Sequence, residues 1–256
     1  MRTFGFFSGA GGGFYGELDT AGKNVQPLKQ AFWLGVEPAD TAAIPLSQLK
    51  VGIPVAPSKI IAVGLNYHDH ARERNKQVPK SPLTWLEAPT SLLPSGGTIE
   101  LPFSDHRIDY EAELCIVIGK RAKNVAAADA HDFIFGYTAA NDVTDRTIQD
   151  GEGQNARGKS FDTFTPVGPF VYSGVDVSDI PVVLELNGET RQNGRTGEMI
   201  FKPADVIAFI TKCTTLLPGD IIITGTPAGV GNLKAGDRVV VKIGAFAPLS
   251  ADVKAA

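Results

Sequence analysis

Apolar residues along the chain gather in short runs rather than in long helical stripes. Runs rich in β-branched residues occupy residues 59–67, 109–120, 134–144, 220–227 and 237–244. This length and composition are typical of buried strands, each bounded by turn residues. The hydrophobic pattern therefore predicts a chain built mainly from short strands.

Helix signals are fewer. Residues 202–213 form the clearest candidate, because Pro203 suits the first turn of a helix and the apolar residues that follow lie along one face. Residues 126–131 and 67–73 are shorter candidates. The dipeptide Asn187-Gly188, between an apolar and a polar run, predicts a two-residue hairpin. Strands outnumber helices and do not alternate with them, which favours a mixed α/β, β-rich fold over a doubly wound sheet.

A composition shift near residues 51–57, where two prolines precede an apolar run, suggests a domain boundary. We expect residues 1–56 to form a small N-terminal β-domain, with strands at FGFF and AFWLGV, and residues 57–256 to form the main domain. Residues 78–102 are punctuated by prolines and predict one long loop, of the kind that is often functional.

Composition narrows the class of protein. The chain has 256 residues, 43% of them hydrophobic, and a formal net charge of -4, which argues against nucleic acid as a partner. No apolar run has the length of a membrane span, and the N-terminus lacks the pattern of a secretory signal. Cys115 and Cys213 both lie in apolar runs and are expected to be buried and reduced. These features predict a soluble, cytoplasmic protein with no membrane partner.

Two nucleotide-binding patterns match by letter only. Residues 153–160, GQNARGKS, fit the phosphate-loop pattern, but polar residues precede them and two prolines follow where a helix is required. Gly11, Gly13 and Gly16 fit a dinucleotide pattern without the strand or helix that it needs. We interpret both as ordinary turn sequences.

Carboxylates provide the first chemical signal. Glu111 and Glu113 are two residues apart in a predicted strand, so both side chains point to one face, and Asp142 follows another apolar strand. Like charges held together in an apolar segment are unfavourable unless a cation lies between them, and carboxylate oxygens suit Mg²⁺, Mn²⁺ or Ca²⁺. The alternative is an edge strand whose glutamates face solvent, and the pattern alone does not decide between the two.

His70 and Glu73 provide the second signal. Their three-residue spacing places both on one face of a helical turn, where a carboxylate can orient an imidazole that acts as a general base. The alternative is a simple ion pair or hydrogen bond at the end of a surface helix.

The polar tract at residues 142–162 is the third signal. Its density of hydrogen-bonding groups suits a substrate loop, with Arg146, Gln149 and Lys159 as donors to carboxylate or carbonyl oxygens. Thr226 lies just after a predicted strand, at a point that often faces a cleft. A solvated loop and an ordinary turn are the corresponding alternatives.

Taken together and in order, six segments resemble the fumarylacetoacetate hydrolase family: AVGLNYHDHARE, IDYEAELCIVIGK, GYTAANDVTDRTIQ, GKSFDTFTPVGPF, LNGETRQ and LLPGDIIITGTPAGVG. The resemblance covers residues 59–241. It implies a β-sandwich roll like that of the family's C-terminal domain, a homodimer, and a Mg²⁺ or Mn²⁺ cofactor. The implied roles are metal ligation by Glu111, Glu113 and Asp142, water activation by His70 with Glu73, and contact with the keto acid of the substrate by Gln149, Lys159 and Thr226. Lys159 is also a candidate catalytic residue, as a point charge on a developing enolate, and Arg146 matches a neighbouring substrate-binding position.

The resemblance also implies a small-molecule 2-oxo acid as substrate. Our first hypothesis is hydrolysis of a carbon–carbon bond in an acylpyruvate-like 2,4-dioxo acid through a metal-stabilised enolate. The second is an isomerase or decarboxylase of a hydroxymuconate-type 2-oxo diacid with the same metal site. A non-catalytic β-rich binding protein is a third, which predicts no metal dependence. Trp85 matches an aromatic position of the family, but Glu87 stands where a lysine is common.

Overall fold

The computed structural model describes all of residues 1–256, and its largest element is a twelve-stranded sheet. Its main path runs β4-β3-β2-β1-β14-β12-β11-β17-β6-β7, while β5 pairs with β1 and β8 with β14. The strands are β1 (Arg2–Gly9), β2 (Gly12–Leu18), β3 (Asn24–Pro27), β4 (Ile44–Pro45), β5 (Lys50–Val51), β6 (Ile60–Gly64), β7 (Leu83–Glu87), β8 (Leu92–Pro94), β11 (Ala112–Ile118), β12 (Ile134–Asn141), β14 (Thr165–Ser173) and β17 (Ile221–Ile223).

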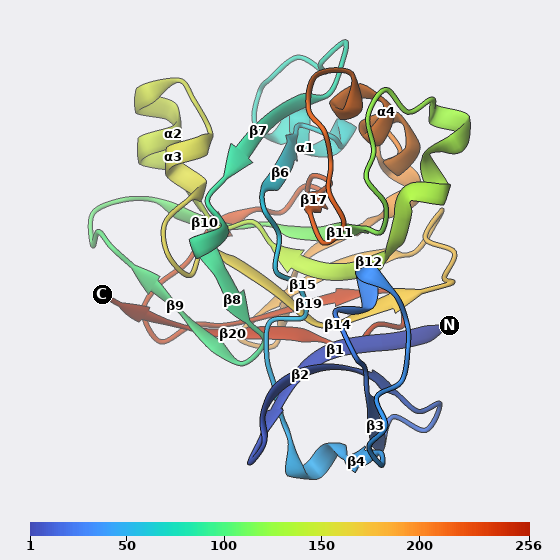
Figure 1. The fold of residues 1–256 in the computed structure, drawn as a ribbon. Coiled ribbons are helices and arrows are strands. Elements are labelled where there is room, and N and C mark those ends of the chain that lie inside the picture. Colours follow the sequence, from blue (N-terminus) through green and yellow to red (C-terminus); the bar gives the residue numbers. More distant parts are fainter.

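Two smaller sheets complete the β-structure (Figure 1). The five-stranded sheet has the order β16-β15-β19-β20-β9, and the three-stranded sheet has the order β13-β10-β18. Their strands are β9 (Gly97–Leu101), β10 (Ile108–Tyr110), β13 (Thr144–Asp145), β15 (Pro181–Leu186), β16 (Glu189–Arg195), β18 (Gly231–Asn232), β19 (Arg238–Ile243) and β20 (Leu249–Ala255).

Helices are short and few, as the pattern predicts. The α-helices are α1 (His68–Glu73), α2 (Arg146–Glu152), α3 (Ala156–Lys159) and α4 (Pro203–Cys213), and the 3-10 turns are η1 (Phe32–Leu34), η2 (Leu46–Gln48), η3 (Pro89–Ser91), η4 (Ala127–Phe133) and η5 (Thr196–Glu198). None of these helices is both long and apolar enough to cross a membrane. The mixed, β-rich class is confirmed.

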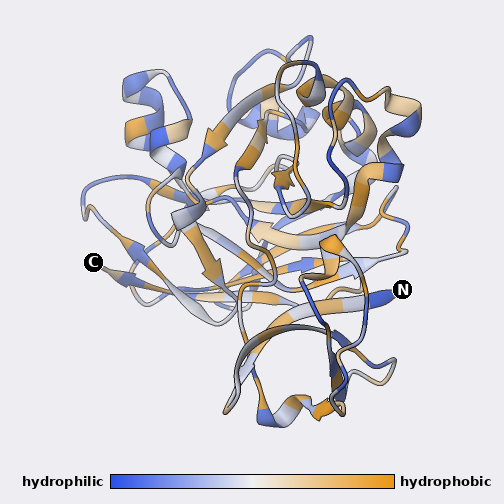
Figure 2. Cartoon of the chain, in the orientation of Figure 1, coloured by the Kyte–Doolittle hydropathy of each residue, from blue (hydrophilic) through white to orange (hydrophobic).

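The central strand β11 is buried on both faces, which explains its uninterrupted apolar sequence. Leu114 and Ile116 belong to the core between the large and the five-stranded sheets, together with Val182 and Val241. The alternate residues, Cys115 and Val117, face a second apolar cluster on the other side. Figure 2 shows apolar residues concentrated in the strands through the middle of the molecule. Since Glu113 lies two residues before Cys115 in the strand, its side chain is on the same face as Cys115 and points away from the core between the two sheets.

Several expected elements are confirmed. Five predicted strands appear as β6, β11, β12, β17 and β19, and the clearest predicted helix is α4. Asn187 and Gly188, with φ angles of 55° and 83°, join β15 to β16 as a hairpin of the predicted kind. Residues 9–12 form the turn between β1 and β2, and residues 153–160 begin just after α2 and include all of α3. Neither rejected nucleotide motif therefore has its structural context.

Four expectations are wrong. AFWLGV is a 3-10 turn, because Phe32 and Trp33 pack into an aromatic cluster instead of pairing as a strand. Residues 78–102 contain β7, β8 and β9, whose partners are distant in sequence. The polar tract contains α2 and α3. Cys213 is exposed, although Cys115 is buried as expected.

The N-terminal strands continue the large sheet, because β1 pairs with β14 in register Phe4↔Val171. They extend it at the lower end of Figure 1. The division into domains at residue 56 stays a prediction, as does the expected homodimer.

Candidate active site and metal centre

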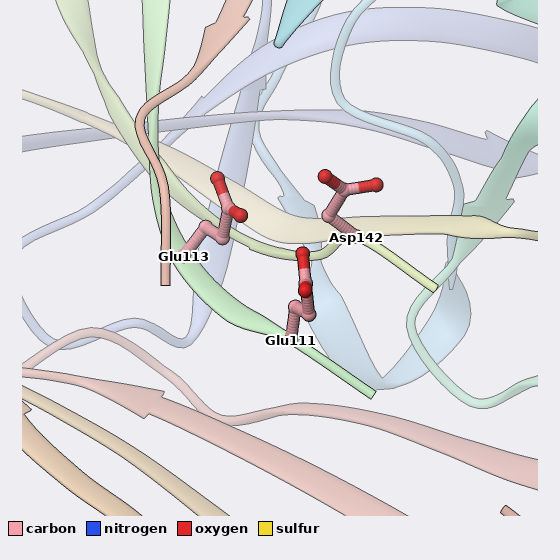
Figure 3. A group of neighbouring side chains, drawn as sticks. All are labelled: Glu111, Glu113 and Asp142. Carbon is pink, nitrogen blue, oxygen red and sulfur yellow. The ribbon is translucent and has the colours of Figure 1, made fainter. Parts of the chain in front are cut away.

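Three carboxylates meet where the chain passes from the three-stranded sheet into the large one. Glu111 lies between β10 and β11, Glu113 lies within β11, and Asp142 follows β12. The pairing of Ala112 with Asn141, and the bond from the Asp142 amide to the Glu111 carbonyl (2.9 Å), bring the two strand ends together. One oxygen atom from each carboxylate lies within 4.8 Å of the others (Figure 3). The predicted convergence is confirmed.

These carboxylates are buried, with 5%, 1% and 2% exposure for Glu111, Glu113 and Asp142. The Glu111 carboxylate accepts from Lys159 (2.9 Å) and from the Arg146 guanidinium, and Lys159 also donates to Asp142. Burial would raise the pKa of Glu111, but the Arg146 and Lys159 cations outweigh burial and lower it. Burial with two neighbouring carboxylates raises the pKa of Glu113 well above its usual range.

Asp142 is also a buried carboxylate without enough compensating positive charge. Burial raises its pKa to about 6, an effect that Lys159 opposes and Glu111 reinforces. One of its oxygen atoms, Oδ1, is buried and has no hydrogen-bond partner. Two protein cations thus do not satisfy the three carboxylates. A buried cluster of oxygen ligands with an orphaned oxygen fits a hard divalent cation such as Mg²⁺ or Mn²⁺.

A glycine turn holds Glu113 in place. The amide of Gly225 donates to Glu113 Oε2 at 2.6 Å. Gly225 has φ +95°, and a Cβ there would lie 2.6 Å from the Cβ of Asn66. Only glycine combines this conformation with so close an approach. The amide after β17 therefore faces the cleft, as the sequence suggested.

Helix α1 carries the histidine across the cavity from the carboxylates. His70 is 5% exposed, its Nδ1 lies 2.9 Å from Glu73 Oε2, and its Nε2 lies 4.0 Å from Glu111 Oε1. Backbone amides of Ala228 and Gly229 donate to Asp69 and Glu73, which fastens the helix to the loop after β17. If Nδ1 carries the proton toward Glu73, then Nε2 presents its lone pair to the cavity.

Helix α2 positions Arg146 and Gln149. Asp145 caps the helix by accepting from the Ile148 amide (2.9 Å). Arg146 donates to Asp109 (2.9 Å) and to Gln149 Oε1 (2.9 Å), in addition to Glu111. Burial lowers the pKa of Arg146, but the adjoining carboxylates raise it by more, so it stays charged. The predicted donor is therefore already engaged with protein groups.

The Thr226 hydroxyl is likewise part of the scaffold. It donates to the Ala112 carbonyl (2.9 Å) and accepts from Gln192 Nε2 (2.7 Å). A cavity of about 360 Å³ nevertheless brings the predicted residues together. Its deep end is lined by polar and charged residues and glycine: Glu111, Glu113, Arg146, Gln149, Lys159, Gly225 and Thr226. One wall is apolar and includes Val63, Leu65, Leu83 and Trp85. The mouth is charged and includes Arg74, Lys76 and Asp150.

Several supporting residues escaped prediction. Asp109, fully buried, holds Arg146, and Gln192, fully buried, accepts from the Ala112 amide (2.8 Å). His106 pairs with Asp145 at 2.6 Å, although its partner was not visible in sequence. Each contact joins residues more than 30 positions apart, so no local spacing indicates it. Asp145 could have been identified from the sequence, because an aspartate just before a helix is a common N-cap.

Comparison with known proteins places this site in context. A family model described as "Fumarylacetoacetate (FAA) hydrolase C-terminal" matches residues 59–254. An uncharacterized protein of Methanocaldococcus jannaschii is 46% identical over 189 residues, 74% of this chain and 80% of its own.

Two further matches have named activities. The mitochondrial oxaloacetate tautomerase Fahd2a of Rattus norvegicus is 39% identical over 217 residues, covering 80% of this chain and 69% of its own. The crystal structure of 5-carboxymethyl-2-hydroxymuconate delta-isomerase from Mycobacterium smegmatis superposes with a TM-score of 0.92, at 34% identity and full coverage of both chains.

Proposed function

The chain belongs to the fumarylacetoacetate hydrolase family, and from that premise we propose that it is a divalent-metal-dependent isomerase or tautomerase of a 2-oxo acid. One observation carries the proposal: His70, oriented by Glu73, directs its free nitrogen toward a buried trio of carboxylates in a shared cavity. The named activities of two relatives, a tautomerase and an isomerase, support it. They also move isomerisation ahead of the hydrolysis expected first from the sequence.

Glu111, Glu113 and Asp142 are the residues that would hold the metal. A divalent cation bound there would polarise the carboxylate and 2-oxo groups of the substrate and so acidify the protons on carbon 3. The excess of buried carboxylate over buried cation around these residues supports this assignment.

His70 is the proposed base. With Nδ1–H donated to Glu73, Nε2 accepts the proton from carbon 3 of the substrate, and the imidazolium that forms is stabilised by the Glu73 carboxylate. Returning this proton to a different atom of the enolate completes the isomerisation. The low exposure of His70 keeps bulk water from that proton while it is held.

Lys159 and Arg146 are the proposed anion stabilisers. Burial lowers the pKa of Lys159, but Asp142 and Glu111 raise it by more, so it presents a fixed positive charge to the deep end of the cavity. Such a charge favours the enolate over the neutral ketone. Gln149 and Thr226 line the same end. Gln149 Nε2 donates one hydrogen to Asn155 and has a second for the acid group of the substrate, whereas the Thr226 hydroxyl is engaged with the Ala112 carbonyl and shapes the wall.

Hydrolysis of a 2,4-dioxo acid is the second candidate, favoured by the hydrolase description of the family model. In that reaction His70 Nε2 deprotonates water, the oxygen attacks the carbonyl at carbon 4, and the bond between carbons 3 and 4 breaks to give a pyruvate enolate and an acid. The two candidates share the base and the enolate, and they differ in whether water enters.

One experiment separates them. The enzyme is incubated with Mg²⁺ and either the enol form of oxaloacetate or acetylpyruvate, and loss of the enol and dioxo chromophores is followed. We expect the wild type to convert the enol and His70→Ala to lose this activity. The control His68→Ala, which changes an exposed histidine of the same helix, should keep the activity. Cleavage of acetylpyruvate without enol conversion would establish the hydrolase instead. Turnover retained in His70→Ala would remove the proposed base.

A further inference from the structure

Glu87 is a buried carboxylate beside the site with no role in the mechanism above. It is the last residue of β7 and only 3% exposed. Its Oε1 accepts from Trp85 Nε1 at 2.9 Å, while its Oε2 is buried without any hydrogen-bond partner. Because a buried carboxylate oxygen is unfavourable without a donor, this atom calls for a partner that the present arrangement does not supply.

Lys159 is the cation best placed to become that partner. Its Nζ lies 5.4 Å from the centre of the Trp85 ring, the same indole that donates to Glu87. Burial and the Asp142 carboxylate raise the pKa of Glu87, and Lys159 acts in the opposite direction. The ammonium of Lys159 is now bound to Glu111 and Asp142.

Those two carboxylates are also proposed metal ligands, so Lys159 and a divalent cation would compete for them. Both oxygen atoms of Glu111 are engaged by cations, one by Arg146 and one by Lys159. A divalent cation at this point would lie next to the Lys159 ammonium and repel it. The buried carboxyls of Glu111, Glu113 and Asp142, with Glu87 beside them, outnumber the cations Lys159 and Arg146, and Arg146 is shared with the buried Asp109. A divalent ion would therefore reduce a local excess of acidic groups.

We propose that Glu87 is the positioning residue for Lys159: it receives the lysine ammonium on its free Oε2 when a divalent cation occupies Glu111, Glu113 and Asp142. The lysine then stays charged and close to the cavity, held between the Trp85 ring and Glu87. This inference rests on the proposed metal site but concerns a residue outside it.

The choice of variant distinguishes this role from a simpler one. If Glu87 served only to orient Trp85, Glu87→Gln would be harmless, because the amide oxygen still accepts from the indole. If Glu87 receives Lys159, the same variant removes the charge that draws the ammonium away from the metal. Glu87→Asp keeps that charge and is expected to restore metal binding.

Calorimetric titration of Mg²⁺ into the whole protein tests this directly. We expect Glu87→Gln to weaken Mg²⁺ binding about fivefold or more. In a Lys159→Met background the same substitution should weaken Mg²⁺ binding by a factor about threefold or more smaller, because Glu87 acts through the lysine. Glu185→Gln, which removes a glutamate from the remote pair with Lys242, is the matched control and should bind as the wild type does. Unchanged affinity in Glu87→Gln, or an equal loss in both backgrounds, overturns the proposal.

A crystal structure of the wild-type protein with Mg²⁺ tests it without any variant. Lys159 Nζ within hydrogen-bond distance of Glu87 supports the proposal, and Nζ remaining on Glu111 and Asp142 overturns it. Neither measurement requires turnover. If the wild type binds Mg²⁺ normally but Glu87→Gln does too, only this inference fails; if the wild type binds neither Mg²⁺ nor Mn²⁺, the proposed function fails with it.

Discussion

Replacing Asp142 by asparagine removes a negative charge that destabilises the metal-free protein. Asp142 is 2% exposed, and burial raises its pKa from 3.8 to about 6 despite the nearby Lys159. At about 1.4 kcal/mol for each tenfold change in acidity, that difference corresponds to roughly 3 kcal/mol at neutral pH. Because the asparagine gives Lys159 a weaker partner, we expect a net gain of about 1–3 kcal/mol in the free energy of unfolding.

The pH dependence fixes the sign of this effect. A folded-state pKa above the unfolded value means that the folded protein binds this proton more tightly. The stabilisation that this proton gives the wild type is therefore complete below the unfolded value of 3.8 and lost as pH rises through about 6. The advantage of Asp142→Asn should be small at about pH 4 and reach its full size above about pH 7.

Thermal unfolding in EDTA measures the effect, at roughly 2–4 °C in Tm per kcal/mol for a chain of this size. Adding Mg²⁺ at about 1,000 times its Kd should reverse the order, because it stabilises the wild type by about 4.1 kcal/mol and the variant lacks a ligand atom. Asp132→Asn, at an exposed position, is the control and should change neither value. A variant that is less stable than the wild type at high pH in EDTA, or that gains equally from Mg²⁺, would refute the reasoning.

Three further predictions follow from the same contacts. Gly225→Ala should destabilise the fold by about 1–3 kcal/mol and weaken Mg²⁺ binding, because φ is +95° and the new Cβ meets Asn66; equal urea midpoints would contradict this. Gln192→Leu leaves the Ala112 amide and the Pro227 carbonyl without partners and should cost about 2–4 kcal/mol in urea unfolding, whereas Gln154→Leu at an exposed site should cost little. Mg²⁺ affinity, followed by calorimetry, should fall as pH drops through about 6, since protons compete for Asp142 and Glu113; affinity independent of pH would mean that these carboxyls are not ligands.

Local spacing predicted that the acidic side chains converge, but it left open whether they face solvent or a metal. Glu111 and Glu113 share a strand face because side chains alternate, and Asp142 joins them because it ends the strand that pairs with theirs. The hairpin at Asn187-Gly188 and helix α4 were equally readable, since each depends on residues within a few positions of one another.

Most of the wrong expectations arise from contacts between residues that are far apart in the chain. Strand β8 pairs in parallel with β14, and β9 pairs in parallel with β20. Because these partners lie far along the chain, the proline-rich sequence of residues 78–102 does not by itself indicate strands. Phe32 and Trp33 have strand-forming composition, yet aromatic packing against Phe4 and Tyr15 determines their conformation. Gln192 supports the site from a different sheet.

Helix α2 was missed for a different reason. Its signals are local, an aspartate cap at Asp145 and a left-handed glycine at Gly153, but the polarity of the tract outweighed them. The candidate donors Arg146, Gln149 and Lys159 were identified before the two short helices that carry them. Chemistry-bearing residue types were therefore easier to recognise than their scaffold.

Exchange of the carbon 3 protons of a 2-oxo acid in D₂O, followed by proton NMR, tests the central claim most directly. The account predicts that the wild-type enzyme with Mg²⁺ incorporates deuterium at carbon 3, that EDTA stops the exchange, and that His70→Ala with Mg²⁺ loses it while His68→Ala retains it. Exchange that continues in His70→Ala, or none in the wild type with either Mg²⁺ or Mn²⁺, would contradict it.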